Sequence, residues 1–109
     1  MATLTATPLA AAGVLNSTSA AAGGGDKVKP QGDHVWIEVT NGSGGSINVT
    51  IPSYPTVRGQ AVTDRVVAVA ASATKKIPIY EDLNTNPADG LAAITYSAVT
   101  SVTVGAYRL

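Results

Sequence analysis

This sequence is most informative in the side chains that it lacks. It contains no cysteine, which excludes disulfide bonds, thiolate-bound zinc and thiol catalysis. It contains one histidine, His34, which begins a strand-like segment with no nucleophile motif nearby, so we do not expect a Ser-His-Asp site. A metal site built on imidazole needs more ligands than this chain offers. The sequence therefore predicts a protein that is not an enzyme, with no catalytic, cofactor-binding or metal-binding residues.

Large side chains are also scarce. The 109 residues include no phenylalanine, one tryptophan and four tyrosines, and the apolar content is mostly alanine, valine and isoleucine. A buried valine or isoleucine contributes only about 1.5–3 kcal/mol, so the core of this one small domain should be thin. We therefore expect a domain that gains stability by burying more surface against partners.

Charge is low and balanced, with seven basic and seven acidic residues interspersed along the chain. Such a distribution offers no face of a single sign, so we do not expect binding to nucleic acid or to an anionic membrane. No segment approaches the ~20 consecutive apolar residues of a membrane-spanning helix.

The first third of the chain, residues 1–33, is a block of alanine, threonine, serine and glycine with no charge before Asp26. Gly23-Gly24-Gly25 should act as a flexible hinge. Two interpretations stay open for this block: a flexible tail, or an arm that becomes ordered when it lies on a partner. In the second interpretation, four apolar side chains are spaced like anchors for shallow pockets: Leu4, Leu9, Val14 and Leu15.

Residues 34–109 instead show the alternation of apolar and polar side chains that is typical of half-buried β-strands. Turns rich in glycine and proline separate these segments, and Pro78 marks one of them as an edge strand or a bulge. We therefore predict an all-β domain, an antiparallel β-sandwich (Ig-like or jelly-roll-like) of six or seven short strands with an extended N-terminal arm. The predicted strands cover residues 34–40, 47–51, 66–70, 74–80, 91–97 and 102–109, with a weaker one within 56–65.

Two turns in this domain are predicted to join neighbouring strands. Asn41-Gly42-Ser43-Gly44-Gly45 is a strong turn signal between the first strand and a return strand. A short polar break separates two runs of β-branched and aromatic residues at the C-terminal end, and this pattern predicts a β-hairpin over Leu91–Leu109. On its second arm, Tyr107 should face away from Val102 and Val104.

Two aromatic side chains are candidates for partner binding, because aromatic anchors are common at interfaces. Trp36 lies on the opposite face of its strand from Val35 and Ile37, and Tyr54 follows the next strand. Two interpretations of Trp36 stay open. Either Val35 and Ile37 face the core, and the indole lies outward or beneath the arm or a neighbouring chain, or Trp36 itself belongs to the core.

Three carboxylates, Glu81, Asp82 and Asp89, lie in one ten-residue loop with two asparagines between them. Oxygen-rich loops can hold calcium, but this spacing matches no calcium-binding loop. We interpret the segment as a solvated turn.

Four short motifs give the C-terminal part of the chain a resemblance to a known family. They are A-V-A-A-S-A-T-K-K at residues 68–76, I-P-I-Y-E at 77–81, D-G-L at 89–91 and S-V-T-V-G-A-Y-R-L at 101–109. With them the chain resembles the small capsid-decoration (minor capsid) proteins of tailed double-stranded-DNA bacteriophages over residues 34–109, and by composition alone over residues 1–33.

This resemblance implies a structural virion protein without enzymatic activity. It would lie on the outer capsid surface, bind the major capsid protein and cement the shell. A homo-oligomer would suit this role, with a trimer as one arrangement because capsids offer three-fold sites. An alternative of a different class also stays open: a carbohydrate- or surface-binding β-sandwich module of a phage fibre or a secreted adhesin, with Trp36, Tyr54 and Tyr96 as stacking platforms.

Overall fold

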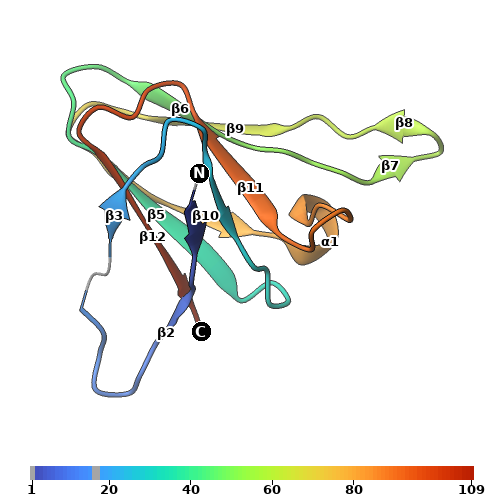
Figure 1. Cartoon of the computed structure of the whole chain (residues 1–109), viewed down its shortest axis with the longest axis horizontal. Coiled ribbons are helices and arrows are strands. Elements are labelled where there is room, and N and C mark those ends of the chain that lie inside the picture. The colour runs from blue at the N-terminus through green and yellow to red at the C-terminus, as the bar shows by residue number, and fades with distance from the viewer. Residues whose placement is uncertain (1, 16–17) are drawn as a thin grey trace.

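The structure of this chain, a computed structural model, describes residues 2–15 and 18–109. This part of the chain is nearly all β, with a single turn of helix, α1 (Glu81–Asn84). Two five-stranded sheets enclose one core in a β-sandwich, which confirms the predicted fold class (Figure 1). A ribbon of two short strands, β7 (Thr56–Val57) and β8 (Gln60–Ala61), projects beyond the sandwich at the right of Figure 1.

The first sheet has the strand order β1-β4-β11-β6-β9, and the second has the order β10-β5-β12-β2, with β3 also paired to β12. The strands of the first sheet are β1 (Ala2–Leu4), β4 (Asp26–Val28), β11 (Ala92–Tyr96), β6 (Ile47–Ile51) and β9 (Arg65–Val69). Those of the second are β10 (Thr74–Ile79), β5 (Val35–Asn41), β12 (Val102–Arg108), β2 (Thr7–Pro8) and β3 (Ser19–Ala20). The longest strands, β5, β6 and β9 to β12, correspond to the six that the alternation predicts.

The alternation along β5 shows how the sequence forms these strands. Val35, Ile37 and Val39 are buried, whereas Trp36 and Glu38 between them are only half-buried. Because successive side chains of a strand point to opposite faces, each sheet turns its branched apolar residues into the shared core. Trp36 therefore faces outward, as the first of its two interpretations predicts. The largest fully buried side chains are Ile37, Ile51, Ile77, Ile79, Ile94, Val28, Val35, Val39, Val49, Val69, Val102 and Val104.

The two predicted pairings between consecutive strands are wrong. β11 pairs with β4 and β6 in the first sheet, whereas β12 pairs with β5 in the second, so Leu91–Leu109 is not a hairpin. β5 and β6 also lie in different sheets, and the turn after Asn41 carries the chain from one sheet to the other. An alternating pattern reports which face of a strand is buried, not which strand lies beside it. Consecutive strands can therefore point into the core from opposite sheets.

Asn41 holds the crossing between β5 and β6. Its side chain is fully buried, and its Nδ2 donates hydrogen bonds to the carbonyl oxygens of Gly45 at 2.8 Å and Val69 at 3.1 Å. Its Oδ1 accepts hydrogen bonds from the N–H of Ser43 at 3.0 Å and from the Ser43 hydroxyl at 2.6 Å. Both ends of the amide are thus satisfied, and they join the turn to the end of β9.

The N-terminal third contributes strands to both sheets, and the structure does not show it as an arm separate from the sandwich. β4 lies between β1 and β11, and its Val28 is fully buried. β1 pairs with β4 in parallel, and so does β2 with β12, so the sheets are mixed rather than purely antiparallel. These strands are two or three residues long, and partners far away in the sequence supply their hydrogen bonds.

Candidate functional site

The N-terminal segment, defined as residues 2–15 and 18–20, runs along one edge of the sandwich. β1 extends the first sheet beside β4, and β2 and β3 both pair with β12 in the second sheet. The N-terminal loop, defined as residues 9–15, leaves this edge after β2 and projects from the molecule at the lower left of Figure 1. The segment therefore covers the same edge of both sheets.

Two side chains of the N-terminal loop, Leu9 and Val14, lie against the outer face of the second sheet. With Trp36 and Tyr107 they line a cavity of about 130 Å³, which we call the Trp36 pocket. Trp36 and Tyr107 are opposite each other on β5 and β12, and their stacked rings have centroids 6.2 Å apart. Tyr107 faces outward but is buried, so other side chains cover its ring. The remaining lining residues of the pocket are Glu38 and Lys76.

The indole N–H of Trp36 is unsatisfied in this pocket. Its Nε1 atom is buried and has no hydrogen-bond partner within the described part of the chain. A buried donor without an acceptor costs about 1–3 kcal/mol. Glu38 and Lys76 are register partners on β5 and β10, so one charge of each sign lies at the margin of the pocket.

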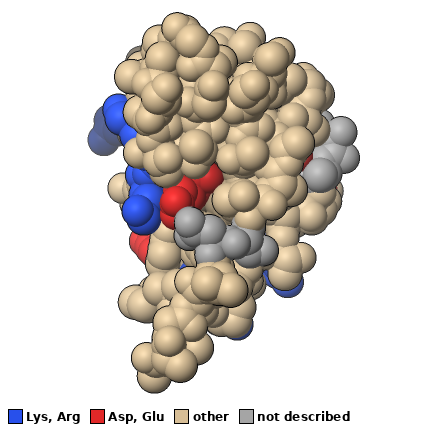
Figure 2. Space-filling view, turned by 90° about the vertical axis from the view of Figure 1, so that its left-hand side faces the viewer, with Lys and Arg blue, Asp and Glu red and all other residues tan. Residues whose placement is uncertain are grey.

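Apolar side chains are exposed around the pocket. Leu15 exposes 90% of its surface, Leu9 exposes 43% and Val14 exposes 36%. Figure 2 shows the side of the molecule that carries β3. Much of this side is uncharged, with basic side chains along one margin and acidic side chains next to them. Exposed apolar residues gathered on a face with few charges are typical of a surface that binds another macromolecule.

Four of the six side chains predicted to bind a partner lie at this surface. Leu9, Val14 and Trp36 line the pocket together, and Leu15 follows Val14 on the same loop. The sequence could not show that the loop and β5 meet, because the meeting depends on β2 pairing with the end of β12.

The other two predicted side chains lie elsewhere. Leu4 packs against the core from β1, so it does not offer its side chain to a partner as Leu15 does. Tyr54 is half-buried in the connection between β6 and β7, where its N–H donates a hydrogen bond to the carbonyl oxygen of Leu83 at 3.1 Å.

Three pocket residues, Glu38, Lys76 and Tyr107, are not among the predicted partner-binding side chains, and Tyr107 is the aromatic one. Its outward direction was predictable, because it alternates with the buried Val102 and Val104. Its neighbour was not predictable, because the expected hairpin paired this strand with residues 91–97. Pairing with β5 places Tyr107 opposite Trp36 and creates the aromatic pair.

A second and larger cavity, of about 400 Å³, lies between the N-terminal segment and the edge of β12. Residues 3–8 and 18–19 line one side of it, and residues 104–106 line the other. Neither β2 nor β3 pairs with Gly105 or Ala106, which lie between the two places where these strands meet β12. The segment is therefore held at separate short contacts rather than along a continuous ladder.

A buried acid lies where the N-terminal third joins the rest of the sandwich. Asp26 is 1% exposed, and its Oδ2 accepts hydrogen bonds from the Tyr96 hydroxyl at 2.8 Å and from the N–H of Ala22 at 3.3 Å. Burial and, after it, this hydrogen bond to Asp26 raise the pKa of Tyr96. Tyr96 also packs against the core, so its ring is not the free platform that a sugar-stacking role requires.

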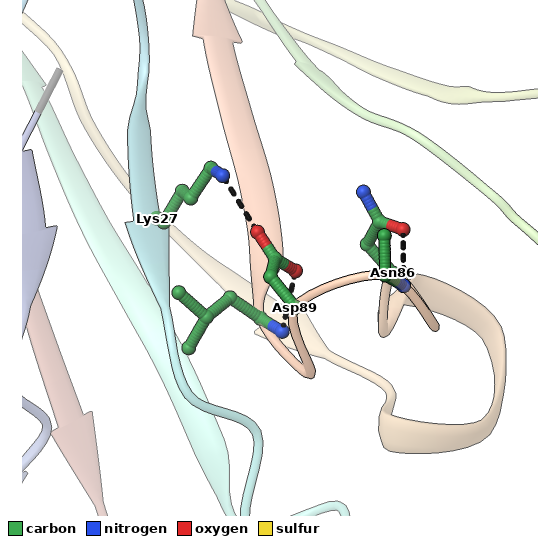
Figure 3. Close-up of polar contacts among 5 residues, drawn as sticks. Lys27, Asn86 and Asp89 are labelled. Carbon is green, nitrogen blue, oxygen red and sulfur yellow. Dashed lines mark hydrogen bonds and ion pairs between the residues drawn. The ribbon is translucent and has the colours of Figure 1, made fainter.

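The carboxylate loop interacts with its own chain (Figure 3). Lys27 Nζ forms an ion pair with Asp89 Oδ2 at 2.6 Å, and Asp89 Oδ1 accepts a hydrogen bond from the N–H of Leu91 at 3.0 Å. The hydrogen bond from Lys27 is the main reason that the pKa of Asp89 is lowered. Asn86 Oδ1 accepts a hydrogen bond from the N–H of Ala88 within the same turn. In the described residues, no three histidine, aspartate or glutamate side chains lie close enough to hold a metal ion.

The candidate site therefore consists of the Trp36 pocket and the exposed side chains of the N-terminal loop. No helix in the described ranges is long and apolar enough to cross a membrane. Comparison with known proteins found no family model, no curated protein and no solved structure that matches this chain.

Proposed function

We propose that this chain is a capsid decoration protein that binds the outer surface of a phage capsid and cements the major capsid shell. The observation that carries the proposal is the exposed, uncharged surface of the N-terminal loop beside the Trp36 pocket. The kind of partner comes from the resemblance of residues 68–81, 89–91 and 101–109 to phage decoration proteins.

The physical properties of this surface suit attachment to a repeating shell. An exposed leucine gains about 1.5–3 kcal/mol when a partner buries it, so one small contact of this kind binds weakly. A shell presents the same site many times, and copies that also contact one another add avidity without a larger interface. We therefore propose a homo-oligomer on the capsid, with a trimer as the form that a three-fold site would hold.

The direct test replaces Leu15 by aspartate. Leu15 is 90% exposed, so Leu15→Asp should leave folding unchanged while placing a charge in the proposed interface. Attachment should weaken by about tenfold or more, because the contact loses the burial of one leucine and gains a desolvated charge. The measurement is co-sedimentation of the variant with undecorated shells of the major capsid protein encoded with this chain.

Val57→Asp is the matched control, because Val57 is also exposed, at 66%, but lies on the β7–β8 ribbon away from the pocket. It should attach like the unmodified protein. Equal attachment of Leu15→Asp and the unmodified protein would contradict the proposed binding surface. Failure of the unmodified protein to attach at all would contradict the proposed function.

One observation favours the second candidate function, a carbohydrate- or surface-binding module. The Trp36 pocket combines aromatic side chains with Glu38 and Lys76, whose polar groups could bind the hydroxyl groups of a sugar. The other two platforms of this hypothesis do not support it, because Tyr96 packs against the core and Tyr54 lies outside the pocket. Binding to a glycan array that is lost in Trp36→Ala, with no attachment to shells, would favour this candidate.

A further inference from the structure

We propose that the N-terminal segment can be exchanged between two copies of this chain, as in domain swapping. In one state it pairs with the strand edges of its own sandwich, and in the other state it pairs with the same edges of a second copy. The occupant of the β12 edge is then either the segment of the same chain or that of a neighbour. This inference concerns the free protein and does not depend on the proposed capsid function.

The first argument is that the segment adds little to the core. The largest fully buried side chains in the described part of the chain all lie between Val28 and Val104. The segment contributes the small Ala6 and the partly buried Leu4. The interior of the sandwich is therefore built by later residues. When the segment leaves, the apolar surface that it uncovers includes the outward-facing rings of Trp36 and Tyr107 beside Leu9 and Val14.

The second argument is that the described residues of the segment form strand pairings with only two strands of the later sandwich, β4 and β12. Leu9 and Val14 also pack on the outer face of the second sheet. β1 aligns three residues with β4, β2 aligns two with β12, and β3 aligns two with β12. The cavity of about 400 Å³ separates these contacts. The contacts are mostly backbone pairing, and the strand edges that accept the segment are identical in every copy. A neighbour's segment would therefore find the same register without any new complementary surface.

The third argument is the turn between β3 and β4, which can serve as a hinge. Residues 22–25 carry the chain from the second sheet to the first, and the N–H of Gly25 closes the turn on the carbonyl oxygen of Ala22 at 2.9 Å. A side chain at Gly23 would meet nothing within 4 Å, whereas one at Gly25 would lie 2.7 Å from the carbonyl oxygen of Ile94. The turn is therefore packed against β11 at Gly25, and its free part precedes that residue. The three residues before Gly25 in extended form reach roughly 10 Å, which takes the segment off its own edge.

Concentration decides between the two states. The closed state is intramolecular and should dominate in dilute solution, whereas exchange gains when copies are held close together. The chain has no cysteine, so a pair of engineered cysteines reports the state without interference from other thiols.

The test is the variant Ala20→Cys/Thr103→Cys. These residues are register partners on β3 and β12, on opposite sides of the proposed hinge, and directly opposed strand residues are close enough for a disulfide. In the closed state the disulfide forms within one chain, and in the exchanged state it joins two chains. The protein is incubated at concentrations from micromolar to millimolar, then oxidised and separated on a non-reducing gel.

We expect a covalent dimer whose fraction rises severalfold from the lowest to the highest concentration. The matched control is Thr40→Cys/Thr74→Cys, register partners on β5 and β10 that both follow the hinge, and it should stay monomeric throughout. Thr3→Cys/Lys27→Cys, on β1 and β4, reports the other end of the segment and serves if the first pair does not oxidise.

Light scattering of the unmodified chain over the same concentrations provides an independent measurement. A chain that remains monomeric at every concentration would overturn the proposal. So would a dimer in which the Ala20–Thr103 disulfide stays within one chain, because that dimer must use another interface.

Discussion

The N-terminal segment (residues 2–15 and 18–20) and residues 26–109 belong to the same two sheets but are held there by different forces. In the later part, isoleucine and valine side chains from both sheets fill a shared core, and strands of five to seven residues form continuous ladders. In the earlier part, strands of two or three residues meet strand edges, and their apolar side chains are mostly small or exposed.

This difference shows that a segment can be part of a β-sheet without contributing large side chains to the core. Burial of branched side chains supplies most of the stability of a domain, whereas each hydrogen bond adds only about 0.5–1.5 kcal/mol net. A segment held by a few backbone contacts can therefore be ordered and still detach at small cost. Substitutions in the two parts should therefore lower the free energy of unfolding by different amounts.

The largest effect should come from Ile37, which is fully buried at the centre of β5. Ile37→Ala should lower the free energy of unfolding by about 2–5 kcal/mol, because it removes buried methyl groups and leaves a cavity. Leu4→Ala, the matched change in the N-terminal segment, should cost only about 1 kcal/mol because Leu4 is partly exposed. Urea unfolding followed by tryptophan fluorescence measures both, and equal losses would show that the segment is part of the core.

A smaller effect is expected at the junction between the two parts, where Tyr96 donates its hydrogen bond to the buried Asp26. Tyr96→Phe should cost about 1–3 kcal/mol, because the buried carboxylate loses a donor. If the free energy of unfolding of Tyr96→Phe did not differ measurably from that of the unmodified protein, the hydrogen bond between Tyr96 and Asp26 would not contribute to stability.

The pH dependence of this contact has a defined sign. The pKa of Tyr96 is raised in the folded state, so its contribution to stability is present below the ordinary value of 10.0 and is lost as the pH rises above it. Urea unfolding at about pH 8 and about pH 11 should show this loss in the unmodified protein and in Tyr54→Phe. Tyr96→Phe should lose less stability over the same interval.

The smallest effect should come from the ion pair between Lys27 and Asp89, which is half-exposed on both sides and therefore screened by solvent. The pKa of Asp89 is lowered, so its contribution is present above the ordinary value of 3.8 and is lost as the pH falls. Asp89→Asn keeps the acceptor for Leu91 and removes the charge. It should lower the melting temperature slightly at neutral pH and leave it unchanged at about pH 2.

The candidate site was partly predictable from the sequence. Leu9, Val14, Leu15 and Trp36 were identified as partner-binding candidates from the uncharged composition of the first third and from the alternation of β5. Their assembly was not predictable, since it needs β2 to pair with β12 and so bring the loop over the second sheet. Leu4 lies elsewhere because a spacing of apolar residues does not say which of them turn toward the core. Tyr54 lies elsewhere because its residue type does not determine where the connection between β6 and β7 runs.

The strands of the main sandwich and their buried faces followed from the amino-acid order, because a period of two is a local property of each segment. Which strands lie side by side was decided by the tertiary structure. β4 illustrates the reason: Asp26–Val28 is too short to carry a period, and it is a strand because β1 and β11 supply hydrogen-bond partners on both sides. The partners of β11 and β12 are likewise far away along the chain. The local pattern therefore predicts both strands correctly, but only the tertiary structure places them in opposite sheets.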